Sequence, residues 1–258
     1  MGNPVVHFEV GAADDDPLAA FYGALFGWKL QGFPGGGYTT IDTCGGQGIN
    51  GGIGRSRTGE PWSAFYVEAD DLQAMLDKAA TLGGTTVLPV TDFGGAVTIA
   101  MFSDPDGLLI GLVQAPPGAS ATAAPAPSAG TGEPVTWFEI FGSDAQRTQR
   151  FYCDLFGWSA GGPGPREYAV LDTGTSRGIQ GAIGGGLAIR WAIVYAAVAD
   201  VDQALAAAER LGGSRVTGTG VEELKAAART ALYGSAADMR TAEFRDPAGN
   251  VFGIYRKS

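Results

Sequence analysis

The sequence FYGALFGW at residues 21–28 returns as FYCDLFGW at residues 151–158, an offset of 130 residues (151 − 21). The same offset relates GINGGIG at residues 48–54 to GIQGAIG at residues 178–184. Matches of this length in one order indicate an internal repeat, in which each copy is one folded unit. We therefore expect two homologous halves.

Two further matches show that the second copy is longer. LGG at residues 82–84 matches LGG at 211–213 at an offset of 129, whereas DPDG at 104–107 matches DPAG at 246–249 at an offset of 142. The second copy therefore holds about 13 additional residues (142 − 129) between these landmarks. They include VEELKAAARTALYG near 221–234, whose composition and spacing predict a short helix.

The stretch between the two copies, APPGASATAAPAPSAGTGE, consists almost wholly of Ala, Pro, Gly, Ser and Thr. Such a segment can bury little apolar surface and is typical of an exposed, partly extended linker. We therefore expect a first domain at 1–114, a linker at 115–133 and a second domain at 134–258.

Each half has the same predicted order of elements. Alternating residues at 4–10 predict a strand, and Asp16-Pro17 predicts the start of a helix that ends at Gly27. Short strands around 38–42 and 49–54 follow, and the half ends with the predicted strand, helix and two strands at 63–68, 72–82, 97–102 and 108–113. This order predicts an α+β fold built from four similar modules.

Charge and hydropathy exclude several classes of protein. Lys and Arg total 17 against 27 Asp and Glu, a net charge of −10, so the chain lacks the basic clusters that grip nucleic acid or an anionic membrane. No run approaches the roughly 18 apolar residues of a membrane span, and the first residues do not resemble a signal peptide. Two cysteines, Cys44 and Cys153, are too few for a disulfide framework, so we expect a reduced cytoplasmic protein.

The motif FYxxLFGW, the glycine-rich GGIG segment, the entry to the second helix and the DPxG turn together resemble the vicinal oxygen chelate superfamily, the glyoxalase/bleomycin resistance/dioxygenase group. The resemblance covers both halves and is greatest to tandem glyoxalase-like proteins. It implies four βαβββ modules that form two domains, each a cupped mixed sheet with helices outside. In this family the cup holds the ligand.

The resemblance also implies where a metal ion would bind. Enzymes of the family use three ligands, which carry over to His7, Ala64 and Gly111 in the first copy and to Trp137, Ile193 and Gly253 in the second. A divalent ion needs oxygen or imidazole donors. Of the six positions only His7 offers one, so we predict that both metal sites are lost and that the protein holds no cofactor.

Aromatic residues mark the expected inner faces of the cups. Strand alternation places Trp62, Tyr66 and Glu68 on one face, and the corresponding face of the second copy carries Trp137, Trp191, Ile193, Tyr195 and Tyr255. Rings that also carry OH or NH groups suit stacking on a planar or apolar molecule. With Glu9, we take Trp62, Tyr66, Trp137, Trp191, Tyr195 and Tyr255 as candidate ligand-binding residues. The alternative is that the rings fill the cavities or pack the halves together.

Three groups are candidate catalysts of proton transfer: Glu139, Glu243 and His7. Glu139 corresponds to Glu9 in the first copy, whereas Glu243 stands where the first copy has Met101, which makes it a difference between the copies. His7 is the chain's only histidine. Together with the additional helix, a possible lid, this asymmetry favours the second cup as the working one.

Three functions remain open. The first is a binding protein that sequesters or carries an aromatic small molecule, in resistance or secondary metabolism. The second is a metal-independent isomerase, cyclase or lyase that uses a carboxylate, a tyrosine or His7. The third, a metal-dependent lyase of the lactoylglutathione type, would need other ligands, for which Gln47, Gln180, Glu9 and Glu139 are the candidates. We expect a small-molecule partner and a monomer or homodimer.

Overall fold

The computed structural model describes residues 2–14, 16–56, 58–115, 124–162, 167–233 and 240–256, without the side chains of residues 16 and 228–233. The first half contains β1 (Val5–Ala12), α1 (Asp16–Phe26), β2 (Lys29–Gly32), β3 (Tyr38–Asp42), β4 (Asn50–Arg55), β5 (Trp62–Ala69), α2 (Leu72–Thr81), β6 (Thr85–Asp92), β7 (Thr98–Ser103) and β8 (Leu109–Gln114). The order is βαβββ twice, as the family resemblance implies; β2 and β6 are the strands that the residue pattern alone did not predict.

The second half repeats this order with one additional helix. It contains β9 (Val135–Gly142), α3 (Ala145–Phe156), β10 (Ser159–Gly161), β11 (Tyr168–Asp172), β12 (Gln180–Gly185), β13 (Trp191–Val198), α4 (Val201–Arg210), β14 (Ser214–Arg215), α5 (Val221–Tyr233), β15 (Thr241–Arg245) and β16 (Val251–Arg256). The additional helix is α5, at the position where the second copy is longer.

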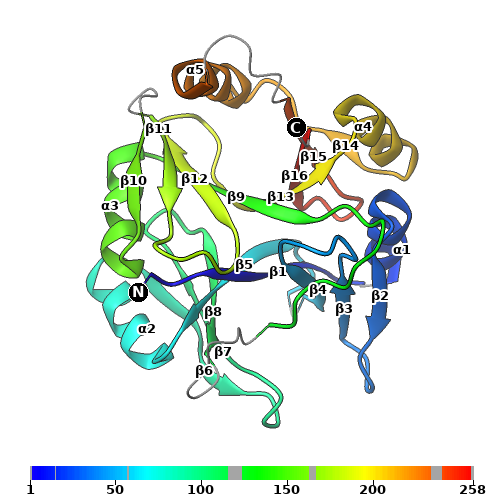
Figure 1. Ribbon diagram of the computed structural model, residues 1–258. Helices are drawn as coiled ribbons and strands as arrows, with labels where there is room; N and C mark the ends of the chain where they lie inside the picture. The colour runs from blue at the N-terminus through cyan, green and yellow to red at the C-terminus, as the bar shows by residue number, and fades with distance from the viewer. Residues whose placement is uncertain are drawn as a thin grey trace.

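Each half forms its own eight-stranded mixed sheet (Figure 1). The first sheet has the order β2-β3-β4-β1-β5-β8-β7-β6, and the second has the corresponding order β10-β11-β12-β9-β13-β16-β15-β14. At the centre of each, two strands from different modules run antiparallel: β1 beside β5, and β9 beside β13. The predicted α+β class, with two tandem glyoxalase-like sheets, is confirmed.

The two faces of each sheet have different roles. Phe65 and Val67 of β5 point into a main core that continues through both halves, whereas Ala64 and Tyr66 point to the opposite face of the sheet. Phe65 meets Phe138 of β9, with ring centroids 4.9 Å apart. We call the faces turned away from the main core the first cup and the second cup.

The repeated motifs join the halves to each other. The hydroxyl of Tyr22 donates to Asp246 Oδ2 and the hydroxyl of Tyr152 donates to Asp104 Oδ2, each over 3.0 Å. The FY motif of each copy therefore binds the DPxG turn of the other. Helix α1 also packs against α4, and α2 packs against α3. The result is a pseudo-twofold arrangement in which the halves share one core.

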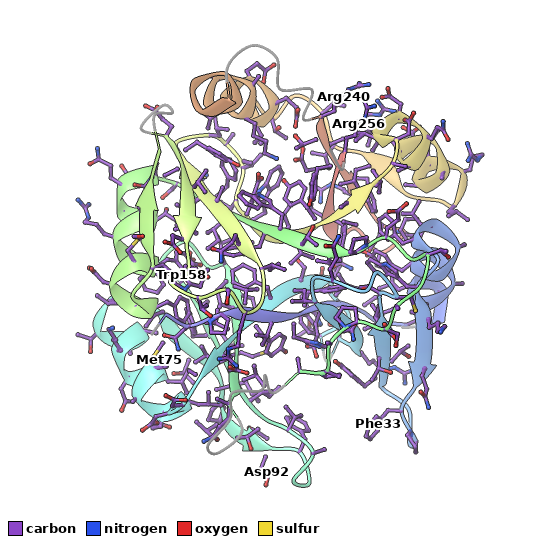
Figure 2. All side chains as sticks on the ribbon, viewed as in Figure 1. Phe33, Met75, Asp92, Trp158, Arg240 and Arg256 are labelled. Carbon is purple, nitrogen blue, oxygen red and sulfur yellow. The ribbon has the colours of Figure 1, made fainter. Side chains whose placement is uncertain are left out.

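Strands β1 and β6 differ from the expectations. Simple alternation along β1 places Val5 and His7 on the same face, but a register shift between them puts Val5 in the main core and Val6 in the first cup. Strand β6 was not expected from the sequence, which has Pro89 in this segment. A strand can hold this proline because β6 lies at the edge of the sheet and is mostly exposed. Figure 2 shows Phe33 and Asp92 at the tips of the outer hairpins.

The linker is more ordered near its end than its composition predicts. Ser128 accepts a hydrogen bond from the backbone of Gly46 and donates its own N–H to Asp42, and Glu133 binds the backbone of Phe26. The carbonyl of Glu133 also accepts from the indole of Trp28 over 2.7 Å. Residues 124–133 therefore lie along the first half instead of extending into solvent. None of the helices that the structure describes has the length and apolarity to cross a membrane.

Candidate functional sites in the two cups

The first cup is apolar over most of its lining. Its centre is formed by five buried side chains: Val6, Ala64, Tyr66, Met101 and Val113. Five half-buried side chains pack against this centre: Trp62, Leu88, Ile99, Leu109 and Ala124. Ala124 is a linker residue, so the linker passes beside this cup. The predicted orientation of Trp62 and Tyr66 toward the cup agrees with this packing.

A tyrosine ring lies on the third inherited metal position in both cups. A Cβ placed on Gly111 would lie 2.3 Å from the ring of Tyr66, and one placed on Gly253 would lie 2.2 Å from the ring of Tyr195. A glutamate at either position has no room, because a Cβ essentially never approaches another atom within 3.0 Å. Glycine is required there by the close approach of the ring.

The residues present do not fit the metal ion of the family's enzymes. Ala64 and Ile193 carry no donor atom, and the glycines at the third position leave their space to tyrosine rings. No three His, Cys, Asp or Glu side chains among the described residues are grouped so that they could hold an ion. The two alternative glutamine ligands do not join such a group, because Gln47 is exposed and Gln180 binds the backbone of Thr173 and Thr175.

The floor of the first cup is polar. The hydroxyl of Tyr66 donates to Glu9 Oε2 over 2.5 Å, and His7 Nε2 lies 3.1 Å from the hydroxyl of Tyr38 and 3.8 Å from Glu9 Oε1. Tyr38 reaches this position because Gly52 lacks a side chain that would collide with its hydroxyl. The side chains of His7 and Glu9 remain 21% and 12% exposed. Both side chains are therefore in contact with solvent.

Burial keeps both tyrosines of the first cup protonated. Desolvation, and then the nearby charge of Glu9, raise the pKa of Tyr66 and of Tyr38 well above that of a free phenol. Both hydroxyls are therefore donors at neutral pH. The floor of the cup offers phenol donors, a carboxylate acceptor and an imidazole within one cluster.

The second cup begins from the same arrangement. The hydroxyl of Tyr195 donates to Glu139 Oε2 over 2.6 Å, as Tyr66 does to Glu9. Tyr168, the counterpart of Tyr38, donates to Glu139 Oε1 over 2.8 Å. All three side chains of this cup are buried, with Glu139 only 2% exposed.

A lysine from α5 fills the centre of the second cup. Lys225 Nζ lies 2.5 Å from Glu243 Oε1, 2.8 Å from Glu139 Oε2 and 2.7 Å from the hydroxyl of Tyr195. We call these four residues the ammonium cluster: Glu139, Tyr195, Lys225 and Glu243. Burial lowers the pKa of Lys225, but the two carboxylates raise it by more than burial lowers it. The pKa therefore lies above its ordinary value, and the side chain is a cation.

This arrangement removes both predicted catalytic carboxylates of the second copy from contact with a ligand. Glu139 and Glu243 are each 2% exposed and both bind the lysine, whereas Glu9 is partly open. The geometry thus favours the first cup over the second, contrary to our sequence-based preference. The sequence analysis missed Lys225, although it lies four residues after Val221 and next to Leu224 on the buried side of α5.

The remaining predicted binding residues surround the ammonium cluster without joining it. Trp137 and Tyr255 are half-buried against the apolar part of the second cup, and the hydroxyl of Tyr255 pairs with Thr136 over 2.6 Å. Trp191 is buried there, and its Nε1 has no hydrogen-bond partner among the described residues. Glu68 is directed to the other half, where Arg177 binds it over 2.6 Å.

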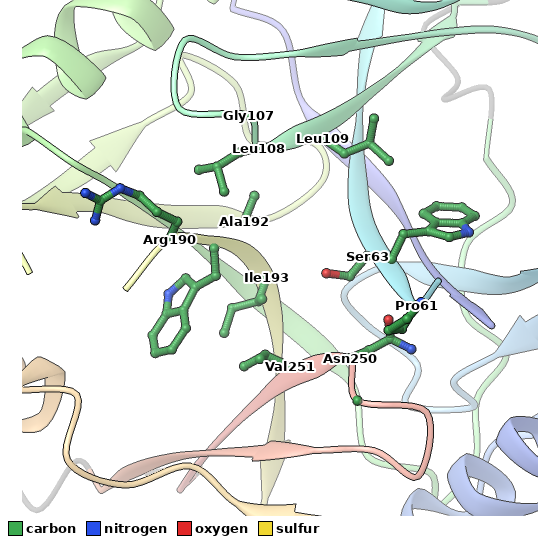
Figure 3. Close-up of a pocket in the computed structure, with 13 residues that line it drawn as sticks. Pro61, Ser63, Gly107, Leu108, Leu109, Arg190, Ala192, Ile193, Asn250 and Val251 are labelled. Atoms are coloured by element: carbon green, nitrogen blue, oxygen red, sulfur yellow. The ribbon is translucent and has the colours of Figure 1, made fainter. Parts of the chain in front are cut away.

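A cavity of about 260 Å³ lies between the two halves (Figure 3). Its lining includes Trp62 and Trp191, which occupy the same place in the two copies, and Figure 3 shows Leu108 and Ser63 of the first half facing Ala192 and Ile193 of the second. This cavity is slightly smaller than most sites for drug-sized ligands, which measure roughly 300–1,000 Å³. It is a further candidate site that adjoins both cups, because Trp62 also packs against the first cup and Trp191 belongs to the second.

Comparisons with known proteins agree with this fold. Residues 5–112 match the model of the Glyoxalase/Bleomycin resistance protein/Dioxygenase superfamily. CFP32 of Mycobacterium tuberculosis, whose name includes the word glyoxylase, is 28% identical over 80% of this chain and 81% of its own. DnrV of Streptomyces peucetius, named an anthracycline biosynthesis protein, is 27% identical over the same shares.

Solved structures share the fold at low sequence identity. The Mn(II)-bound glyoxalase from Novosphingobium aromaticivorans superposes with a TM-score of 0.64 at 16% identity, over 99% of this chain and 82% of its own. The 2,3-dioxygenase LapB from Pseudomonas sp. KL28 gives a TM-score of 0.61 at 15% identity, over 100% and 93%. The first half of the chain, residues 5–112, thus matches the superfamily's model, and the second half repeats its strand order and motifs.

Proposed function

We propose that the protein binds a planar, largely apolar small molecule in the first cup without the metal ion of the family's enzymes. One observation carries this proposal: His7 and Glu9 are partly exposed on the floor of an apolar cup, whereas the corresponding acidic group of the second cup is buried beneath a lysine. A site that is open, apolar and has a few convergent polar groups is typical of small-molecule recognition.

The lining indicates which chemistry such a ligand would have. Trp62 and the thioether of Met101 suit contact with an aromatic ring. Glu9 and the phenol oxygen of Tyr66, whose proton goes to Glu9, accept hydrogen bonds, so a ring bearing hydroxyl groups would satisfy them. A polyhydroxylated aromatic or quinone-like metabolite is the class that fits this lining.

The named relatives support a role in secondary metabolism. DnrV and DauV, of Streptomyces peucetius and Streptomyces sp. strain C5, are both named anthracycline biosynthesis proteins and cover 81% of their own length in the match. A protein that holds a planar metabolite serves either its biosynthesis or its sequestration. Cys44 and Cys153 are both free thiols, which suits our expectation of a cytoplasmic protein, and the tandem halves suit a monomer or homodimer.

Calorimetric titration with polyhydroxylated anthraquinones tests the binding proposal. We expect replacement of Trp62 by Leu to weaken binding at least about tenfold, a loss of roughly 1.4 kcal/mol. Replacement of Trp191 by Leu is the matched control, because Trp191 has the same place in the second copy but does not line the first cup. Treatment with EDTA should leave the affinity unchanged.

Two results would overturn the proposal. Equal weakening by both tryptophan replacements would place the ligand in the cavity between the halves, which both residues line. Loss of binding after chelation, restored by a divalent ion, would show that a metal holds the ligand.

A metal-independent enzyme is the second candidate function, and the position of Glu9 favours it. Its carboxylate lies within 3.8 Å of the only imidazole of the chain and accepts from a phenol, so it can take a proton from a bound acidic C–H or O–H group. If the cup is catalytic, replacement of Glu9 by Gln should abolish conversion of a bound metabolite while binding persists. Conversion that survives this change would exclude Glu9 as the base.

A further inference from the structure

The ammonium cluster of the second cup has the features of a recognition site whose occupant belongs to the chain itself. Three acceptors surround Lys225 Nζ, namely the two carboxylates and the oxygen of Tyr195 at 2.5–2.8 Å, which matches the three N–H donors of an ammonium group. The nitrogen also lies 4.6 Å from the centre of the Tyr195 ring, a cation–π distance. Every partner of the charge is thus supplied by the cup.

We propose that the second cup is a binding site for a primary alkylammonium group and that Lys225 is its tethered occupant. When α5 moves away from the cup, Glu139, Glu243 and Tyr195 bind the ammonium of a small amine in place of the lysine. This site is separate from the first cup and does not depend on what the first cup binds.

The acceptor geometry suits an ammonium better than a divalent metal ion. Tyr195 is a neutral phenol, because burial and then the charges of Glu139 and Glu243 raise its pKa well above the ordinary value. Its oxygen accepts from Lys225 while its proton goes to a carboxylate, so it connects the cation to the acids. The cup has two carboxylates for one cation, an acidic excess that favours a positively charged occupant.

The differences between the copies occur together. The first cup has Met101 where the second has Glu243, and it has no helix corresponding to α5. Glu243 and Lys225 therefore belong to one arrangement that the first cup lacks. A carboxylate retained only for packing would not need to be accompanied by a helix that delivers its counter-ion.

Helix α5 is held to the cup by few side chains. Among its described side chains only Val221 and Lys225 are buried, and Leu224 is half-buried. The other four described side chains are exposed: Glu222, Glu223, Ala226 and Ala227. The described attachments of the helix are this small apolar contact, the ion pairs of Lys225, and the hydrogen bonds from the hydroxyl of Thr241 to Glu222. An amine that competes for the carboxylates therefore competes directly with docking of α5.

Replacement of Lys225 by Ala tests the proposal, because it removes the occupant and leaves the three acceptors. We expect n-butylammonium to raise the melting temperature of this variant with a saturable concentration dependence, beyond the effect of NaCl at equal ionic strength. The neutral 1-butanol should have no such effect. Binding should weaken at least about tenfold when Glu243→Met is added, because this variant reproduces the first cup.

The overturning result is a folded Lys225→Ala protein on which n-butylammonium acts no more than NaCl; the cluster would then be only a structural ion pair. If the variant does not fold, hydrogen exchange of the wild-type protein decides. We expect n-butylammonium to accelerate exchange in α5 selectively over NaCl, and unchanged exchange overturns the proposal.

Discussion

The two cups share one motif but differ in what surrounds its charged glutamate. In each, a tyrosine ring lies on a glycine and its hydroxyl binds a glutamate: Tyr66 with Glu9, and Tyr195 with Glu139. In the first cup the glutamate stays partly exposed beside His7, whereas in the second a further carboxylate and a lysine bury it.

This difference shows how a repeated fold can separate two roles. A buried carboxylate is costly unless a partner compensates its charge, and in the second cup Lys225 compensates both Glu139 and Glu243. The first cup has no such need, because solvent and any ligand reach Glu9. One copy thus keeps an accessible polar floor, while the other uses the same floor to hold a helix.

The largest expected effect comes from removing the cation of the second cup. Replacement of Lys225 by Met leaves Glu139 and Glu243 buried without a counter-ion, which costs about 3–5 kcal/mol of folding free energy. Urea denaturation measures this loss. The double change Lys225→Met with Glu243→Met copies the first cup and should recover most of it; a double variant as unstable as the single one contradicts the account.

The tyrosine hydroxyls give a direct comparison of the cups. Replacement of Tyr195 by Phe removes a hydroxyl that binds three charged groups and should cost about 3 kcal/mol, whereas Tyr66→Phe should cost about 1 kcal/mol because water can replace the hydroxyl near Glu9. Chemical denaturation of both variants checks the ratio. Equal losses would show that burial does not separate the cups.

Much of this architecture could be predicted from local sequence. The repeats at FYxxLFGW and DPxG gave two halves of equal order, and alternation along residues 62–69 placed Tyr66 on the cup face and Phe65 in the core. Alternation works here because both faces of β5 are buried against different partners. It failed at Val5 and Val6, where a bulge changes the register and no local residue type signals it.

The ammonium cluster could not be predicted in this way, because it depends on where α5 docks. Lys225 comes from an insertion, and its partners Glu139 and Glu243 lie on two different strands of the second sheet. Because Lys225 follows Val221 and Leu224 at helical spacing, the sequence pattern predicts that it lies at the solvent-exposed edge of the helix's apolar face. Only the three-dimensional packing shows that its ammonium enters the cup.

The interface between the halves is where the two copies should behave alike. Tyr22 donates to Asp246 and Tyr152 donates to Asp104 over the same distance, and all four groups are buried. Replacing either tyrosine by Phe should therefore cost about 1.5–2 kcal/mol, and the two losses should agree within about 0.5 kcal/mol. Thermal and urea denaturation measure both. Unequal losses would mean that the asymmetry of the cups extends into the shared core.

The smallest expected effect is the pH dependence of this interface. Burial raises the pKa of Asp104 and of Asp246 above the ordinary 3.8, so the folded state binds these protons more tightly than the unfolded chain does. Their contribution to stability is thus greatest below the unfolded pKa and declines as the pH rises through the raised folded values. Asp106 has a lowered pKa and acts in the opposite direction, so only a difference between proteins isolates the effect.

Replacing both Asp104 and Asp246 by Asn provides that difference, because the amide keeps an oxygen for the turn's backbone N–H groups and does not titrate. The free energy of unfolding of the wild type, minus that of the double variant, should fall as the pH rises from roughly 3.5 to 6.5. Each single variant should give part of the change, and the two parts can differ because Asp246 also accepts from the side chain of Asn250, where the first copy has Leu108. A difference that rises with pH would show instead that the tyrosine hydrogen bonds outweigh desolvation and hold both carboxyls ionised.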